Sequence, residues 1–173
     1  MIYKVKKFGF LSYSNVELFD IFKAWLAVSI AFGIVLSSSL SLFAKAFLVA
    51  AVAVGLGFLV HELCHKIVAQ KFNFKAEFRS FDEMLFLAVI MSFFGFVFAA
   101  PGAVMIFSRV FDKRKNGIIS AAGPIMNILL SLVCLLILIL IVGSFSSALD
   151  IIKLPINNVL DMSLGYSIII IGF

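Results

Sequence analysis

The chain has 173 residues, of which 64% are hydrophobic and 13% charged, and its mean hydropathy is +1.21. So apolar a balance excludes a soluble globular protein and predicts a chain that crosses the bilayer several times. The net charge of +5 lies in short loops, which favours orientation by the positive-inside rule and contact with lipid headgroups over nucleic-acid binding.

The first apolar run follows a polar to amphipathic stretch over residues 1–17. This run is too long for a signal peptide and has no small-residue cleavage site, so we predict an uncleaved transmembrane helix over 18–42. Lys23 and Trp25 near its start are typical of the inner membrane interface, where lysine snorkels and tryptophan anchors a helix. The amino terminus is therefore expected on the cytoplasmic side of the cell membrane.

A second transmembrane helix, predicted over 46–70, contains the sequence H-E-L-C-H at residues 61–65. Residues four apart share one face of a helix, so His61 and His65, the only histidines of the chain, can bind one metal ion. Glu62 can reach a water on that ion, which is the zincin arrangement of two imidazoles and a general base. The alternative is a structural polar cluster, but a charge at the bilayer centre costs roughly 2.5–3.5 kcal/mol, which favours a functional site.

Other residues of this helix allow more than one interpretation. Cys64 could bind a metal as a thiolate, but His65 completes the better-known spacing. Cys64 and Cys134 stand alone in apolar runs, which argues against a disulfide framework. Gly55 and Gly57 precede the motif, and glycine there either admits a closely packed helix or serves catalysis.

The apolar segment over 84–107 has basic residues on both sides. Before it lie Lys66, Lys71, Lys75 and Arg79, and after it lie Arg109, Lys113, Arg114 and Lys115. A single crossing would place one of these clusters outside, so we predict a re-entrant segment that keeps both in the cytoplasm. The run A-P-G-A at 100–103 breaks a helix, and 104–107 can then run extended where protein or a cavity covers it.

A third transmembrane helix is predicted over 118–142 and opens with A-A-G-P-I-M-N. Pro124 is tolerated near a helix start, and Asn127 places a polar side chain about two turns in. Asn127 either makes an interhelical hydrogen bond or faces a site. An outer loop over 143–153 leads to a last apolar stretch over 159–173 that turns back inward.

Together these elements predict an all-α polytopic membrane protein of about four transmembrane helices plus a re-entrant, partly extended segment. We expect a single intramembrane domain over residues 1–173, without an internal repeat. The end of the bundle that carries the metal site is expected to face the cytoplasm.

Three motifs in this order resemble the site-2 protease family of intramembrane zinc metalloproteases. They are H-E-L-C-H in the second helix, P-G-A-V at 101–104, and A-A-G-P-I-M-N at the start of the next helix. The resemblance covers most of the chain from about Glu17 onward. It implies an enzyme that cleaves membrane-embedded proteins and requires zinc as its cofactor.

The resemblance also implies a role for each motif. His61 and His65 would bind zinc, and Glu62 would act as the general base. Asn127 would hold the opened substrate or the developing oxyanion. The substrate would become extended and pair with the strand that begins with Pro101, Gly102, Ala103 and Val104.

The chain departs from the family pattern at the third metal ligand, an Asp in an N-x-x-P-x-x-x-x-D-G segment. The stretch L-P-I-N-N-V-L-D at 154–161 has the wrong spacing and no Gly after Asp161. A span that enters near Val159 leaves Asp161 on the order of 15–20 Å from His61 along the membrane normal, which disfavours Asp161 as the ligand. We therefore expect the family's Asp beyond Phe173 in a longer chain, and we expect the 173-residue form to bind zinc weakly and to be nearly inactive.

The predicted function is hydrolysis of peptide bonds in membrane-embedded protein substrates by a zinc metalloendopeptidase in the lipid bilayer. One alternative is a non-catalytic relative that binds membrane protein partners, which the missing third ligand favours. Another is a small transporter, which would be expected to show repeats or paired half-helices. The sequence leaves the substrate and the oligomeric state open.

Overall fold

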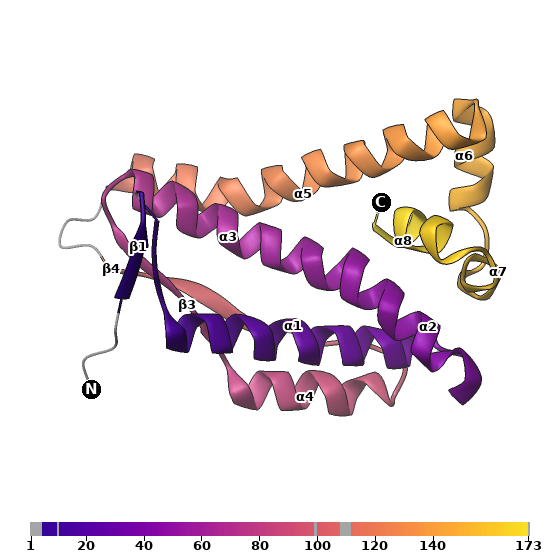
Figure 1. Cartoon of the computed structure of the whole chain (residues 1–173), viewed down its shortest axis with the longest axis horizontal. Coiled ribbons are helices and arrows are strands. Elements are labelled where there is room, and N and C mark those ends of the chain that lie inside the picture. Colours follow the sequence, from indigo (N-terminus) through magenta and orange to yellow (C-terminus); the bar gives the residue numbers. More distant parts are fainter. Residues whose placement is uncertain (1–4, 10, 99, 108–111, 173) are drawn as a thin grey trace.

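Three long helices packed side by side form the body of the protein in the computed structural model, which describes residues 5–9, 11–98, 100–107 and 112–172. They are α1 (Asn15–Leu36), the segment Leu40–Lys71, and α5 (Lys113–Val142), and each is long and apolar enough to cross a membrane. The middle segment lies between α1 and α5, and α4 (Asp82–Ser92) covers the outer side of α1 (Figure 1). The expectation of a mostly helical fold with helices of membrane-spanning length is therefore confirmed.

A π-helical turn interrupts the middle segment. Helix α2 (Leu40–Ala50) passes through the π turn η1 (Ala51–Gly55) into α3 (Leu56–Lys71). The carbonyl of Ala51 accepts a hydrogen bond of 3.0 Å from the indole N–H of Trp25 in α1. Trp25 therefore satisfies a main-chain group of the π turn inside the bundle, where the sequence had suggested an anchor at the membrane interface.

Two small antiparallel sheets accompany the helices. The sequence had predicted an all-α fold with one partly extended segment, so the sheets are a correction to that prediction. Strands β1 (Val5–Phe8) and β2 (Leu11–Ser14) form a hairpin that directly precedes α1 in the chain. Strand β3 (Lys75–Ser80) pairs with β4 (Gly102–Phe107), with Lys75 opposite Phe107 and Ser80 opposite Gly102. The extended run at 104–107 is confirmed, whereas β3 and the hairpin were not predicted.

The segment between the two basic clusters leaves one end of the molecule and returns to it. Helix α4 has 11 residues, about 16 Å of helix, which is too short for a ~30 Å hydrocarbon core. At the end of the ladder Lys75 lies opposite Phe107, and Lys115 Nζ lies 5.8 Å from the ring centroid of Phe74. Both clusters therefore lie at one end, as the re-entrant interpretation requires, although Arg109 falls outside the described residues.

The fourth transmembrane helix is not confirmed. The region after α5 forms three short helices, α6 (Phe145–Ile152), α7 (Ile156–Asp161) and α8 (Leu164–Gly172). A break at Met162 separates α7 from α8, and α8 has only nine residues. These helices fold against α5 and α2 around Leu138, Val159 and Leu160, which are almost fully buried.

Helix α5 begins earlier than predicted because Asp112 caps it. The Asp112 carboxylate accepts hydrogen bonds from the backbone N–H groups of Arg114 and Lys115 at 3.0 and 3.1 Å. These bonds lower the pKa of Asp112, and the bond from Lys115 has the larger effect. Pro124 consequently lies inside the helix and removes one hydrogen bond from its ladder.

The re-entrant arrangement predicts that both basic clusters are accessible from the cytoplasm only. In a chain with Cys64 and Cys134 replaced by alanine, Lys75→Cys and Lys113→Cys should each react with a membrane-impermeant maleimide from that side alone. Ser39→Cys, in the turn between α1 and α2 at the other end of the bundle, is the control and should react from the opposite side. Reaction of the Lys75 and Lys113 positions from opposite sides would show that the intervening segment crosses the membrane.

Candidate metal centre

His61 and His65 lie one turn apart on α3 and point toward the same space. Their Nε2 atoms are 3.1 Å apart. Two nitrogens that bind one tetrahedral zinc ion at ~2.0–2.1 Å are separated by about 3.3–3.4 Å. The convergent pair therefore fits a shared zinc ion with little adjustment.

A contact from α5 orients one of the two rings. His65 Nδ1 lies 2.7 Å from the carbonyl oxygen of Ile119, and a carbonyl can only accept, so this nitrogen carries the proton. The Nε2 lone pair of His65 then faces His61, as metal-ligating histidines commonly require. His61 Nδ1 is buried and has no hydrogen-bond partner among the described residues.

Gly123 of α5 closes the site from the other side. A Cβ at this position would lie 2.6 Å from His61 Nε2 and closer still to His65 Nε2. Any side chain there would fill the space next to both nitrogens that a shared ion needs. Sequence reasoning used A-A-G-P-I-M-N for the resemblance but missed this role, because the approach of α5 to α3 is a long-range contact.

A cavity of about 750 Å³ adjoins the histidine pair. It brings together five predicted site residues from three parts of the chain: His61, Glu62, Pro101, Gly102 and Asn127. His65 and Ala103 do not line the cavity: His65 contacts His61 through Nε2, and Ala103 pairs with Arg79 of β3.

Strand β4 runs along the edge of this site. Val104 of β4 and Glu62 of α3 line one small enclosed space. Gly102 is needed for close packing of the strands, because a Cβ there would collide with the Arg79 carbonyl and lie 2.5 Å from the Phe78 ring. The sequence had assigned Gly102 and Val104 to substrate binding, and the structure gives both a contact with the protein itself.

No third metal ligand joins the two histidines in the described part of the chain, where no group of three His, Cys, Asp or Glu side chains converges. Asp161 is exposed at the end of α7. Its neighbour Leu160 packs against Ala46, which precedes His61 by about 22 Å of helix at ~1.5 Å per residue. Asp161 is therefore too remote to bind the same ion.

The membrane-length helices and the histidine pair beside Glu62 define a class of protein, the integral membrane proteins with a zinc-peptidase motif. The chain belongs to peptidase family M50, the site-2 protease family, whose sequence profile matches residues 49–170. The prediction of family from the sequence motifs is confirmed.

A relative from Methanocaldococcus jannaschii, which carries the name "Putative zinc metalloprotease", is 37% identical over 129 residues. The match covers 74% of this chain and 65% of that protein, so the chain spans just under two thirds of the relative's length. No solved structure matches the chain.

The position of Gly123 generates a test with a control in the same helix. Gly123→Ala should weaken zinc binding at least tenfold, because the methyl group would collide with both Nε2 atoms. Gly117→Ala, where a Cβ meets nothing within 4 Å, should leave zinc binding unchanged and stabilise α5 by up to about 1 kcal/mol. Competition titration of the purified protein with a chromogenic chelator measures both, and equal affinities for the two variants would refute the assignment.

Proposed function

We propose that this protein is an intramembrane zinc metalloprotease that hydrolyses peptide bonds of membrane-embedded proteins. The observation that carries the proposal is the single cavity where His61, Glu62, the start of β4 and Asn127 meet. Membership of peptidase family M50 supports the reaction type. The membrane-length helices on either side support a substrate that arrives within the bilayer.

The proposed chemistry assigns separate roles to the residues of α3. His61 and His65 would hold zinc through Nε2, and bound zinc supplies a Lewis acid that makes water acidic enough to attack a carbonyl at neutral pH. Glu62 takes the proton from the attacking water and returns it to the leaving amine. Its place in the wall of the cavity supports this role.

Among the described residues β4 pairs only with β3, so its outer edge is suited to an extended substrate. In β3 the N–H of Phe78 and the carbonyl of Ala76 bond to residues outside the sheet. Their partners Val104 and Ile106 in the antiparallel ladder must likewise direct their main-chain groups away from β3. A substrate segment unwound from its helix would find hydrogen-bonding groups along this edge, next to Glu62.

Asn127 supports the same interpretation from the opposite wall. Its side chain is exposed in the cavity, and within the described residues no hydrogen bond holds it to another helix. An amide in this position can donate to a substrate carbonyl or to the developing oxyanion. We therefore prefer this role to the interhelical hydrogen bond that the sequence left open.

A non-catalytic relative that binds membrane proteins is the second candidate. It is favoured by the absence of a third metal-binding side chain near His61 and His65 among the described residues. The two candidates differ in one measurement, which is cleavage of a membrane-embedded reporter by the zinc-loaded protein.

The first prediction from this function concerns the general base. Glu62→Gln should lower the cleavage rate by at least about 10²-fold, because an amide cannot accept the proton, and should leave zinc binding intact. The control is Glu83→Gln, an exposed residue of α4, which should cleave at the parental rate. Cleavage of a membrane-embedded reporter is measured in the 173-residue chain and in any longer natural form, and a fully active Glu62→Gln variant would exclude the assigned role.

The second prediction concerns the number of ligands. Two imidazoles hold zinc less tightly than the three protein ligands of catalytic zinc sites, so the 173-residue chain should bind zinc weakly and cleave slowly or not at all. Asp161→Ala should change neither property, because Asp161 is remote from the histidines. Zinc stoichiometry and reporter cleavage measure this, and activity that disappears with Asp161→Ala would show that α7 lies elsewhere.

A further inference from the structure

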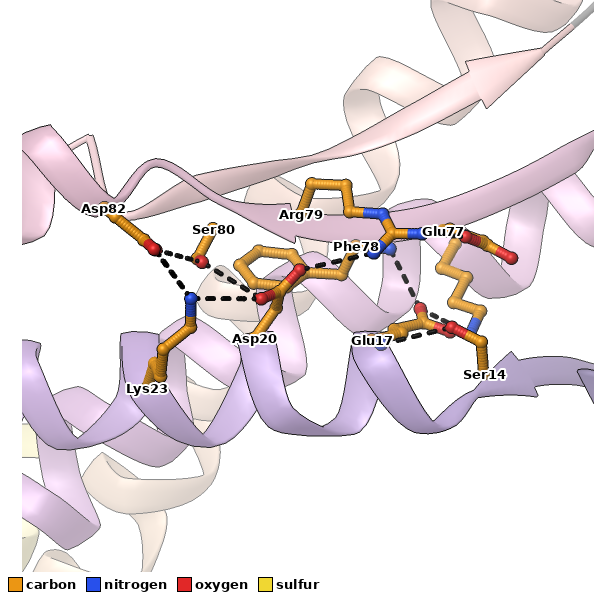
Figure 2. Close-up of polar contacts among 10 residues, drawn as sticks. Ser14, Glu17, Asp20, Lys23, Glu77, Phe78, Arg79, Ser80 and Asp82 are labelled. Carbon is orange, nitrogen blue, oxygen red and sulfur yellow. Dashed lines mark hydrogen bonds and ion pairs between the residues drawn. The ribbon is translucent and has the colours of Figure 1, made fainter. Parts of the chain in front are cut away.

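A buried ion pair lies one helical turn beyond the proposed catalytic residues. Glu17 of α1 is 0% exposed and Lys66 of α3 is 4% exposed, and Lys66 Nζ lies 2.6 Å from Glu17 Oε1. The same oxygen accepts a hydrogen bond of 2.9 Å from the backbone N–H of Phe78 (Figure 2). Glu17 thus connects α1 to both α3 and the edge of β3.

The contacts of Glu17 lead through the sheet to Glu62. Phe78 lies opposite Val104 in the ladder, and Val104 lines the same small space as Glu62. Lys66 follows Glu62 by four residues, so the two share a face of α3. Lys66, Glu62, Phe78 and Val104 also line one small enclosed space between α1 and α3. Glu17 therefore bonds to the outer edge of β3, and the partner strand β4 passes beside Glu62.

We propose that Glu17 is a positioning residue that fixes β4, the strand expected to pair with substrate, relative to Glu62. It acts by accepting the hydrogen bond from Phe78, while Lys66 holds the carboxylate in place. The inference rests on the proposed function, because it assigns the substrate to the free edge of β4. The proposal makes Glu17 of α1 a residue that determines where the substrate lies, although α1 contributes no residue to the cavity wall.

The exposed contacts nearby serve as a comparison. Lys23 Nζ bonds to Asp82 at 2.7 Å, and Ser80 Oγ bonds to Asp82 at 2.8 Å (Figure 2). The Asp82 side chain is 69% exposed, and such surface pairs contribute little. They join α1 to the start of α4 and reach β3 only through the side chain of its last residue, Ser80, without bonding to a main-chain group of β3 or β4. Their loss should therefore leave the position of β4 unchanged.

Two double variants separate positioning from simple attachment of α1 to α3. Glu17→Gln with Lys66→Met removes both charges but keeps an oxygen that can accept from Phe78. Glu17→Leu with Lys66→Met also removes both charges and keeps no acceptor. The ion pair is absent from both, so any difference between them reports on the hydrogen bond to Phe78.

The readout that does not depend on catalysis is hydrogen exchange of segments 75–80 and 102–107 in the purified full chain. We expect at least tenfold faster exchange in both segments for the Leu variant and near-parental exchange for the Gln variant, with equal exchange in α5. Lys23→Met with Asp82→Asn should exchange like the parent. If the Leu variant does not fold, Glu17→Met takes its place, because methionine fills irregular space without an acceptor of comparable strength.

The second readout is reporter cleavage, in which the Leu variant should raise KM at least tenfold while the Gln variant keeps the parental KM. Equal exchange in the two variants, whether both protected or both unprotected, would overturn the positioning role. If no form cleaves the reporter, the proposed function fails, and the exchange comparison still decides whether Glu17 fixes β4.

Discussion

The structure depends on one constraint, which is that a β-strand in an apolar bundle must find partners for both of its edges. An unpaired main-chain group at membrane depth costs several kcal/mol. Strands β3 and β4 pair with each other along one edge, and the outer edge of β3 bonds to side chains. Gln70 and Glu17 bond to the outer edge of β3, and β4 passes beside Glu62. Among the described residues no other strand pairs with the outer edge of β4, and this is the edge that we propose for the substrate strand.

Charged and polar side chains on α3 therefore also join elements of the fold to one another, in addition to the chemistry proposed for this helix. Gln70 donates to the carbonyls of Ser12 and Ala76 and so joins the amino-terminal hairpin to β3. Removing one partner of a buried pair such as Glu17–Lys66 costs about 3–5 kcal/mol, whereas replacing both can be neutral. The pair therefore favours one arrangement of α1, α3 and β3 over others, and adds little to net stability.

The candidate site residues could be predicted from the sequence more readily than the strands and helix contacts around them. His61, Glu62 and Asn127 were identifiable because ionisable and amide groups are rare in apolar runs. Strand β3 was missed because the basic residues of K-A-E-F-R-S suggested a loop, although its polar and apolar residues alternate with period two. The approach of Gly123 to the histidines depends on helix packing, which no local pattern encodes.

Helix α1 shows why motifs alone give an incomplete account of this site. The family profile begins at residue 49, after α1 has ended. Yet α1 bonds to β3 through Glu17 and to the π turn through Trp25. The π turn supplies Ala53 and Val54 to the cavity wall, and β3 supports the strand whose start, Gly102, lines the same wall. Because α1 bonds to two elements of the cavity wall without lining the cavity, we expect substitutions in α1 to shift the proposed substrate strand while His61, His65 and Glu62 stay in place.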